Sequence, residues 1–241
     1  MIETRQDMHV HSTFSDGRDT IEQNVAEAER LGLLELTCVE HVRADTDWVA
    51  DYVAEVRRID STTPVSLFCA VEAKLLDTSG GLDLCPGLDE VDAIYAADHQ
   101  VPLADGPHTP DQVKLLMAEN SLPSAEVFAA IVSSTANALR RHEPVVIAHL
   151  FSVLPKLGLD ECDVPLALIE QLATAAAESG ARIEISERWS CPGVRTLQPF
   201  LQRGVPILLS TDSHRSDTIG RYSYCLRIRE ALTDAGSPVA G

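Results

Sequence analysis

Histidines and acidic residues recur along this sequence in short, regular patterns. His9 and His11 are separated by one valine, and Asp212 and His214 are separated by one serine. In an extended strand, residues i and i+2 point to the same face, so each pair directs two polar side chains the same way. Imidazole and carboxylate groups without a thiolate suit zinc, manganese or iron in the divalent state. Both pairs are therefore candidate metal ligands.

Further residues of the same types end or follow apolar runs between these two pairs. The full set of candidate ligands is His9, His11, Asp16, His41, Glu72, His99, His149, Asp212 and His214. Six of the eight histidines of the chain belong to this set, which is hard to explain by chance. Burying several imidazoles and three carboxylates together is costly unless bound cations pair them. Nine ligands are too many for one tetrahedral ion and indicate two or three divalent ions.

The elements that must position these residues follow from the hydrophobic pattern. Seven short apolar runs predict strands, at residues 8–11, 34–39, 65–73, 93–97, 145–150, 181–186 and 205–210. Amphipathic patterns predict helices at 20–31, 46–59, 124–141, 164–179, 194–203 and 222–235, and the stretches 76–89 and 101–112 are expected to be irregular. Thr20 is a suitable N-cap for the first helix and Gly32 its stop, while Asp47 is expected in the first turn of the second.

Seven strands that alternate with helices predict an α/β fold with a parallel sheet, either wound open or closed into a barrel. In such folds, ligands and catalytic groups gather where the strands end and the loops begin. The candidate ligands occupy these positions. The chain contains no long linker and no internal repeat, so residues 1–241 are expected to form a single domain.

Composition excludes some classes of partner. The 241 residues include 37 acidic and 19 basic side chains, for a net charge of −18, which disfavours the basic face that extended nucleic acid requires. No apolar run approaches the roughly 20 residues of a membrane span, and no segment resembles a targeting signal. The six cysteines are scattered without a C-x-x-C pair, so a cytoplasmic, reduced protein is expected. The oligomeric state stays open.

With these motifs in order, the sequence resembles the PHP (polymerase and histidinol phosphatase) superfamily over nearly its whole length. The resemblance is carried by the H-x-H pair, a following acid, a glutamate–histidine strand end, the A-V-E segment at 70–72, two further strand-end histidines and a terminal D-x-H. Two departures stand out. Ala70 replaces the usual glycine, and residues 184–188 read Glu-Ile-Ser-Glu-Arg where the family usually begins Glu-Ile-Asn, in a segment that lines the substrate pocket.

The resemblance implies a distorted (β/α)7 barrel with a trinuclear metal site on its C-terminal face. It also implies three ligand sets: His9, His11 and Asp212; Asp16, His41 and His214; and His99 and His149, with Glu72 bridging the first and third.

The activity that follows is metal-dependent hydrolysis of a small phosphomonoester, such as a histidinol-phosphate-like amino alcohol, a sugar phosphate or a nucleotide. A hydroxide that bridges two divalent ions is a nucleophile at neutral pH, and the ions neutralise the phosphoryl oxygens. No Gly-x-Ser-x-Gly motif offers a serine nucleophile. Asp212 and His214 are the candidate catalytic residues, because either could protonate the leaving alkoxide.

Arginines are the expected substrate contacts, because the guanidinium fork matches the geometry of a phosphate. Arg43, Arg188 and Arg215 each follow a strand end and are expected on the catalytic face. Lys74 and Lys156 are weaker candidates for the same role.

Two tryptophans and two further histidines lie outside the set of candidate ligands. Trp189, beside Arg188, is a better candidate than Trp48 for a wall of the pocket. His108, in a loop, and His142, at a helix end, are interpreted as structural.

Two alternatives to a phosphomonoesterase stay open. The same cluster could cleave a phosphodiester, a cyclic phosphate or a non-phosphate substrate, which a panel of monoesters and diesters would separate. A non-enzymatic metal-binding module would be expected to have lost ligands, whereas all nine are present.

Overall fold

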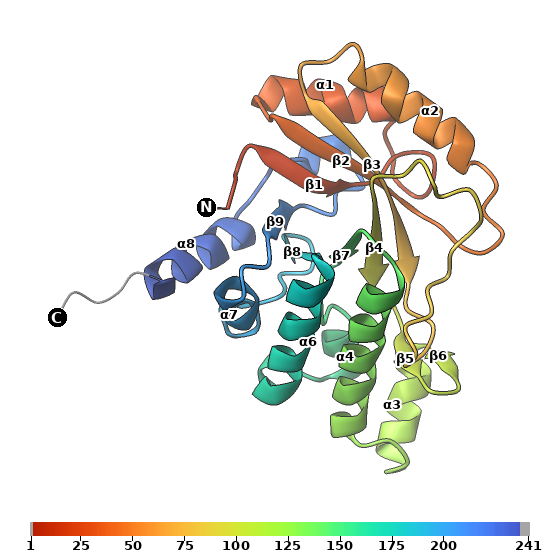
Figure 1. Ribbon diagram of the computed structural model, residues 1–241, viewed down its shortest axis with the longest axis vertical. Helices are drawn as coiled ribbons and strands as arrows, with labels where there is room; N and C mark the ends of the chain where they lie inside the picture. Colours follow the sequence, from red (N-terminus) through yellow and green to blue (C-terminus); the bar gives the residue numbers. More distant parts are fainter. Residues whose placement is uncertain (1, 237–241) are drawn as a thin grey trace.

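The computed structural model describes residues 2–236, and a seven-stranded parallel sheet forms its centre (Figure 1). The strands are β1 (Gln6–Val10), β2 (Glu35–His41), β3 (Ser66–Lys74), β4 (Ala93–Ala97), β7 (Val145–Ile147), β8 (Arg182–Ser186) and β9 (Ile207–Ser210). They lie in the order β1-β2-β3-β4-β7-β8-β9, and all six neighbouring pairs are parallel. All seven predicted strands are confirmed; the one at 93–97 has the predicted bounds, and the other six have shifted ends.

The sheet curls until its two edges meet. The amide of His11 donates to the carbonyl of Ser213 at 2.8 Å, and the amide of Ser213 donates to the carbonyl of His9 at 3.2 Å. This contact forms an isolated parallel bridge between Val10 and Ser213. The sheet is therefore a nearly closed barrel, as the PHP resemblance implied.

Helices cover the outside of this barrel (Figure 1). The longer ones are α1 (Ile21–Leu31), α2 (Val49–Asp60), α3 (Pro110–Ala118), α4 (Ser124–Arg141), α6 (Leu166–Ser179), α7 (Val194–Gln202) and α8 (Tyr224–Gly236), and α5 (Leu154–Leu157) is a single turn. Helices α1 and α2 lie beside β1–β3, while α4, α6 and α7 lie on the other side of the barrel. Within residues 2–236, no helix is both long and apolar enough to cross a membrane.

The core has two parts, as expected for a barrel with an outer layer of helices. The larger part packs the helices against the strands. The smaller part consists of strand and strand-end residues and fills the barrel interior: Met8, Val39, Ala70, Ala93, Tyr95, Ala97, Val146, Ala148 and Leu208. Because the interior is filled, the carboxyl ends of the strands form a floor on which a site can be built.

Helix ends follow the predicted capping in one case and not in another. Thr20 caps α1 through a capping box with Gln23, and Gly32 ends it with a left-handed φ of 72°. Helix α2, in contrast, begins at Val49 after Trp48, so the expectation that Asp47 lies in its first turn is wrong.

The stretch 101–112 is not irregular, which corrects the prediction. It holds the antiparallel hairpin β5 (Val101–Leu103) and β6 (Gly106–His108) and then the start of α3. Thr109 caps α3 through a capping box with Gln112, and Pro110 occupies the first turn. This Thr-Pro-Asp-Gln segment is a recognisable helix start that the polar composition of the stretch obscured. The stretch 76–89 is irregular as predicted, apart from the Leu75–Leu82 bridge.

Strand β7 is shorter than predicted. It ends at Ile147, because the backbone turns into the left-handed region at His149, with φ of 23°, and again at Phe151, with φ of 72°. His149 therefore lies on the loop after the strand, where its ring can turn toward the barrel axis.

Candidate metal centre

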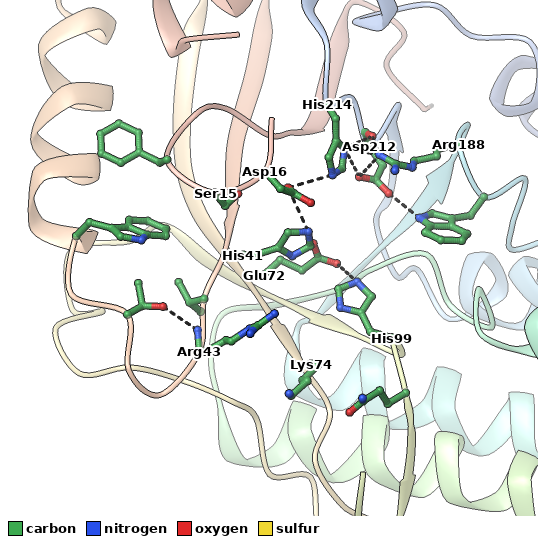
Figure 2. Close-up of a pocket in the computed structure, with 16 residues that line it drawn as sticks. Ser15, Asp16, His41, Arg43, Glu72, Lys74, His99, Arg188, Asp212 and His214 are labelled. Atoms are coloured by element: carbon green, nitrogen blue, oxygen red, sulfur yellow. Dashed lines mark hydrogen bonds and ion pairs between the residues drawn. The ribbon is translucent and has the colours of Figure 1, made fainter. Parts of the chain in front are cut away.

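The nine candidate ligands meet at the carboxyl end of the barrel. Each comes from a strand or from the loop directly after it: β1 (His9, His11, Asp16), β2 (His41), β3 (Glu72), β4 (His99), β7 (His149) and β9 (Asp212, His214). Figure 2 shows several of them converging around one carboxylate. Strand β8 is the exception and supplies a buried glutamate, Glu184, in place of a candidate ligand.

The central carboxylate is Glu72, which is buried and surrounded by five imidazoles. Its Oε2 lies 3.0 Å from His41 Nδ1, 3.4 Å from His9 Nε2 and 3.6 Å from His11 Nε2, and its Oε1 lies 2.8 Å from His149 Nε2 and 3.1 Å from His99 Nε2. Burial raises the pKa of Glu72, but the neighbouring imidazoles outweigh burial and hold that pKa well below its ordinary value. Glu72 is therefore an anion whose two oxygens face different groups of histidines, as a bridging ligand requires.

Three groups of donor atoms are close enough to hold an ion. They are His11, Asp16, His41 and His214; His9, His11 and Asp212; and His41, Glu72 and His99. The second group is the first ligand set of the resemblance, and the first group contains its second set with His11 added. The third group differs, because His41 joins Glu72 and His99. His149 lies outside this group, although it contacts the same oxygen of Glu72 as His99 does.

Two buried polar atoms in this cluster have no hydrogen-bond partner among the described residues, namely His11 Nδ1 and Asp212 Oδ1. Burial lowers the pKa of His11 to about 4, so its imidazole is neutral at neutral pH and offers a lone pair. Burial raises the pKa of Asp212, but its contacts with His11 and His9 hold that pKa below its ordinary range. A neutral imidazole nitrogen and a carboxylate oxygen that each lack a hydrogen bond, with the carboxylate only 3.2 Å from His11 Nε2, fit divalent cations.

Glu184 positions two of the candidate ligands. Its Oε2 lies 3.0 Å from His9 Nδ1, and its Oε1 accepts a hydrogen bond from the amide of His149 at 2.7 Å. When Nδ1 of His9 carries the proton, Nε2 keeps its lone pair and faces the cluster. Sequence reasoning did not assign this role, although an acid within the apolar strand β8 was a usable signal.

Asp98 and Glu40 support the cluster from other sides. Ser152 Oγ donates to Asp98 Oδ1 at 2.7 Å and lies 2.9 Å from His149 Nδ1, which orients that ring. Glu40 accepts hydrogen bonds from the amide of Ser12, at 2.8 Å, and from the hydroxyl of Ser15. Burial raises the pKa of Glu40 to about 7 against these hydrogen bonds. These contacts fix the loop that carries the ligands after β1.

Asp212 is held from its other side by Trp189 and Arg188. Trp189 Nε1 donates to Asp212 Oδ2 at 2.6 Å, and Arg188 donates to the carbonyl of Asp212 at 3.2 Å and lies against His214 Nδ1. The backbone of Asp212 is left-handed, with φ of 51°. Such a conformation is costly for an aspartate, so these contacts hold a strained residue with Oδ1 turned toward His11.

A cavity of about 690 Å³ opens over the cluster (Figure 2). Phe14 and Trp48 give it an aromatic side, and its cations are Arg43, Lys74 and Arg188. Trp189 lines it as well, so both tryptophans considered from the sequence face this cavity.

The remaining residues singled out in the sequence lie elsewhere. Arg215 lines a neighbouring cavity that it shares with Arg188. Lys156 lies over the ring of Trp189, 4.3 Å from the ring centroid, and does not line the cavity over the cluster. His108 belongs to the β5–β6 hairpin and His142 is the C-cap of α4, both away from the cluster.

Comparison with known proteins places the fold. No protein-family model matches the chain, and a search of curated proteins finds no similar sequence. Among solved structures, the chain is similar to a histidinol phosphate phosphatase from Lactococcus lactis subsp. lactis Il1403, crystallised with zinc, L-histidinol and phosphate. The TM-score is 0.67 at 17% identity, over 98% of this chain and 95% of that one. It is also similar to a candidate histidinol phosphatase from Listeria monocytogenes, with a TM-score of 0.64 at 14% identity, over 90% of this chain and 97% of that one. The chain therefore shares the fold of histidinol-phosphatase structures, a distorted (β/α)7 barrel, in agreement with the PHP resemblance of its sequence.

Proposed function

We propose that this protein is a metal-dependent phosphoesterase that hydrolyses a small phosphomonoester. The observation that carries the proposal is the convergence of imidazoles on Glu72, beside two buried atoms, His11 Nδ1 and Asp212 Oδ1, that have no hydrogen bond to any of residues 2–236. The fold is shared with a histidinol phosphate phosphatase that binds zinc and phosphate, which supports the same chemistry here.

The cluster would hold two or three divalent ions, with zinc, manganese or iron suited to its nitrogen and oxygen donors. The candidate ligands are His9, His11, Asp16, His41, Glu72, His99, His149, Asp212 and His214. When bound, such ions supply an activated water at neutral pH and offset the charge of the phosphoryl oxygens.

The side chains around the cluster perform the remaining tasks. Arg188 and Arg43 line the cavity and bind phosphoryl oxygens through their guanidinium groups. Asp212 and His214 lie at the boundary between the ligand groups and the cavity, so either is placed to return a proton to the leaving alkoxide. Phe14 and Trp48, whose rings are inclined at 46° to each other, provide an apolar surface for the remainder of the substrate.

The cavity favours an uncharged or anionic leaving group over a cationic one. Its lining includes Arg43, Lys74 and Arg188. Lys74 lies 3.2 Å from Asp83, whereas neither arginine forms an ion pair with any carboxylate of residues 2–236 outside the candidate ligands. The ammonium group of an amino-alcohol phosphate would meet these cations. We therefore favour a sugar or nucleotide phosphate over histidinol phosphate.

Two further expectations remain part of this proposal. The six cysteines are free, which supports a reduced, cytoplasmic protein. We also propose that residues 1–241 form one domain, because the strands that carry the candidate ligands span most of the chain.

The proposal is tested by metal analysis and phosphate release. Purified protein should contain two or three divalent ions per chain and release phosphate from an aryl phosphate. His9→Ala and Asp212→Ala should abolish release and remain soluble, while His108→Ala is the matched control and should retain it. Protein that contains no metal, and that no divalent ion activates, would contradict the proposal. A panel of monoesters, diesters and cyclic phosphates distinguishes the alternative substrates of the same site.

A further inference from the structure

A second cavity, of about 460 Å³, adjoins the one over the metal cluster. The two cavities share four lining residues, Asp16, Arg188, Asp212 and His214, so the second begins where the candidate ligands end. A molecule held at the cluster can therefore extend into it.

Arginines dominate the lining of this second cavity. Of the 16 arginines in the chain, four line it: Arg18, Arg188, Arg215 and Arg221. The protein as a whole carries a net charge of −18, so this concentration of guanidinium groups does not follow from composition. Three of them, Arg18, Arg215 and Arg221, do not line the cavity over the cluster. They are placed to serve a group other than the phosphate that is cleaved.

The three carboxylates that line this cavity have other partners or roles. Asp16 and Asp212 are candidate metal ligands, and the two oxygens of Glu187 accept the amides of Tyr224 and Cys225, at 2.9 Å each, where α8 begins.

The four guanidinium groups differ in the hydrogen bonds and ion pairs that they already form. Arg215 pairs with Asp217, and Arg221 donates to the carbonyl of Asp217. Arg18 has no hydrogen bond or ion pair from its guanidinium to any residue between 2 and 236. Arg221 lies 4.0 Å from Glu27, at the limit of an ion pair. The guanidinium of Arg18 therefore keeps its donors free for a ligand, beside three arginines that are already oriented.

The loops that carry these arginines are tied to each other and to the metal cluster. The amide of Arg18 donates to the carbonyl of His214 at 2.9 Å, and the amide of Ser216 donates to Asp19 at 2.7 Å. The cavity is thus assembled by backbone contacts that also fix a candidate ligand, and its distance from the cluster is set by the fold.

We propose that the second cavity binds a second phosphoryl group of the substrate, so that the preferred substrate class is small bisphosphorylated molecules. This inference rests on the proposed phosphoesterase function and adds the substrate class to it. One phosphoryl group meets the metal cluster and is cleaved, and the other is held by the guanidinium forks of the arginine cavity. A phosphate dianion offers three oxygens to several forks at once, which a single carboxylate does not.

Non-hydrolysable analogues test this without relying on turnover. Metal-loaded protein is titrated calorimetrically with an alkyl monophosphonate and with α,ω-bisphosphonates that differ in the length of their carbon spacer. The bisphosphonate of the best length should bind at least about tenfold more tightly than the monophosphonate, as expected for an added charge-assisted contact. Arg18→Met and Arg221→Met should each reduce that difference, and together they should abolish it. Arg140→Met, an equal loss of charge on α4 far from both cavities, should leave it unchanged.

Each outcome decides the question. If no spacer length improves on the monophosphonate, or if Arg140→Met removes the gain as well, the second phosphoryl site is wrong. If an ω-phosphonocarboxylate binds as tightly as the bisphosphonate, the cavity selects a carboxylate and the proposal is overturned. Measurements of phosphate release distinguish a failure of the second phosphoryl site from a failure of the proposed phosphoesterase function. If the protein hydrolyses aryl phosphate but does not prefer bisphosphonates, only the second phosphoryl site is refuted. If it prefers bisphosphonates through Arg18 and Arg221 but hydrolyses no ester, only the phosphoesterase function is refuted.

Discussion

Each imidazole of the cluster can serve a metal only if the nitrogen that faces the site keeps its lone pair. At His9 that condition is set by Glu184, which lies 3.0 Å from Nδ1 and leaves Nε2 facing His11 Nε2 at 3.1 Å. The carboxylates of Glu184 and Glu72 overcome burial and raise the pKa of His9 above its ordinary value. Metal binding must therefore compete with a proton at His9, and Glu184 stabilises the ring in either state.

Replacing Glu184 with glutamine tests this positioning role. Glu184→Gln keeps the size of the side chain but removes its charge and one of its two acceptors, so His9 and His149 lose a defined orientation. We expect metal affinity to fall by about 10-fold to 100-fold, as is usual for partners of ligating histidines. Competition with a chromophoric chelator measures the affinity. Glu178→Gln, on the exposed surface of α6, is the matched control, and equal affinities in both variants would refute the role.

Trp189 is expected to act on Asp212 through its indole N–H. Trp189→Phe keeps an aromatic wall but removes the 2.6 Å hydrogen bond to Asp212 Oδ2, so the strained carboxylate is less well fixed. We expect kcat/KM for an aryl phosphate to fall by about tenfold, the size of one hydrogen bond to a charged group. Trp48→Phe changes the same cavity without touching a candidate ligand and should have a smaller effect. If the two variants lose activity equally, the hydrogen bond is not the cause.

At the scale of elements, the loop after β1 has the least freedom. It carries Asp16, it is anchored by Glu40 through Ser12 and Ser15, and it passes very close to the strand it follows. A Cβ at Gly17 would lie 2.7 Å from backbone atoms of His11 and Ser12. Only glycine fits there without moving the backbone, so the loop has one permitted path.

Gly17→Ala should therefore displace Asp16 while leaving the barrel folded. We expect weaker metal binding and lower phosphatase activity, with little change in the far-ultraviolet circular dichroism spectrum. Gly81→Ala is the control, because a Cβ there meets only the side chain of Asp77, at 3.0 Å. Full activity in Gly17→Ala would show that the loop tolerates another backbone path, and that the close approach of Gly17 to His11 and Ser12 is not needed for activity.

The elements were predictable from the sequence to the extent that they are encoded locally. Seven apolar runs indicate strands, and Thr20 as an N-cap with Gly32 as a stop indicates a helix; these predictions are confirmed. The hairpin and α3 were missed because proline and polar residues in 101–112 conceal a short strand pair and the capping box at Thr109. The left-handed turn at His149, which ends β7 early, carries no local signal of its own.

The candidate site was likewise predictable only in part from the sequence. The nine candidate ligands were visible from residue type and strand-end position, and the structure brings them together, although their role as ligands is still a prediction. Glu184, Arg18 and Arg221 were not foreseen as part of the site. Their roles depend on contacts between residues far apart in the chain, such as the 175 positions between His9 and Glu184, and no local pattern records those.

For the molecule as a whole, the candidate ligands span the two edges of the sheet. Strands β1 and β9 meet through the Val10–Ser213 bridge, and the group formed by His9, His11 and Asp212 spans the same junction. An ion bound there would hold the edges together and reduce the penalty of burying charged groups. Metal should therefore stabilise the entire barrel as well as the site.

Removal of metal by a chelator should lower the melting temperature. At a metal concentration of about 100 times Kd, binding adds about 2.7 kcal/mol to the free energy of unfolding, which corresponds to a shift of roughly 5–10 °C for a chain of this size. Differential scanning calorimetry with and without chelator measures the shift. Asp212→Asn should show a smaller shift than the unaltered protein, since it loses a donor at the junction. An identical melting temperature with and without chelator would contradict the proposal that metal stabilises the junction of β1 and β9.

The closure of the barrel also determines when, during synthesis of the chain, the candidate ligands can meet. His9 and His11 leave the ribosome roughly 200 residues before Asp212 and His214. During that interval the group formed by His9, His11 and Asp212 lacks its carboxylate. A metal ion at this group would therefore be acquired only in the step of folding that brings β1 and β9 together.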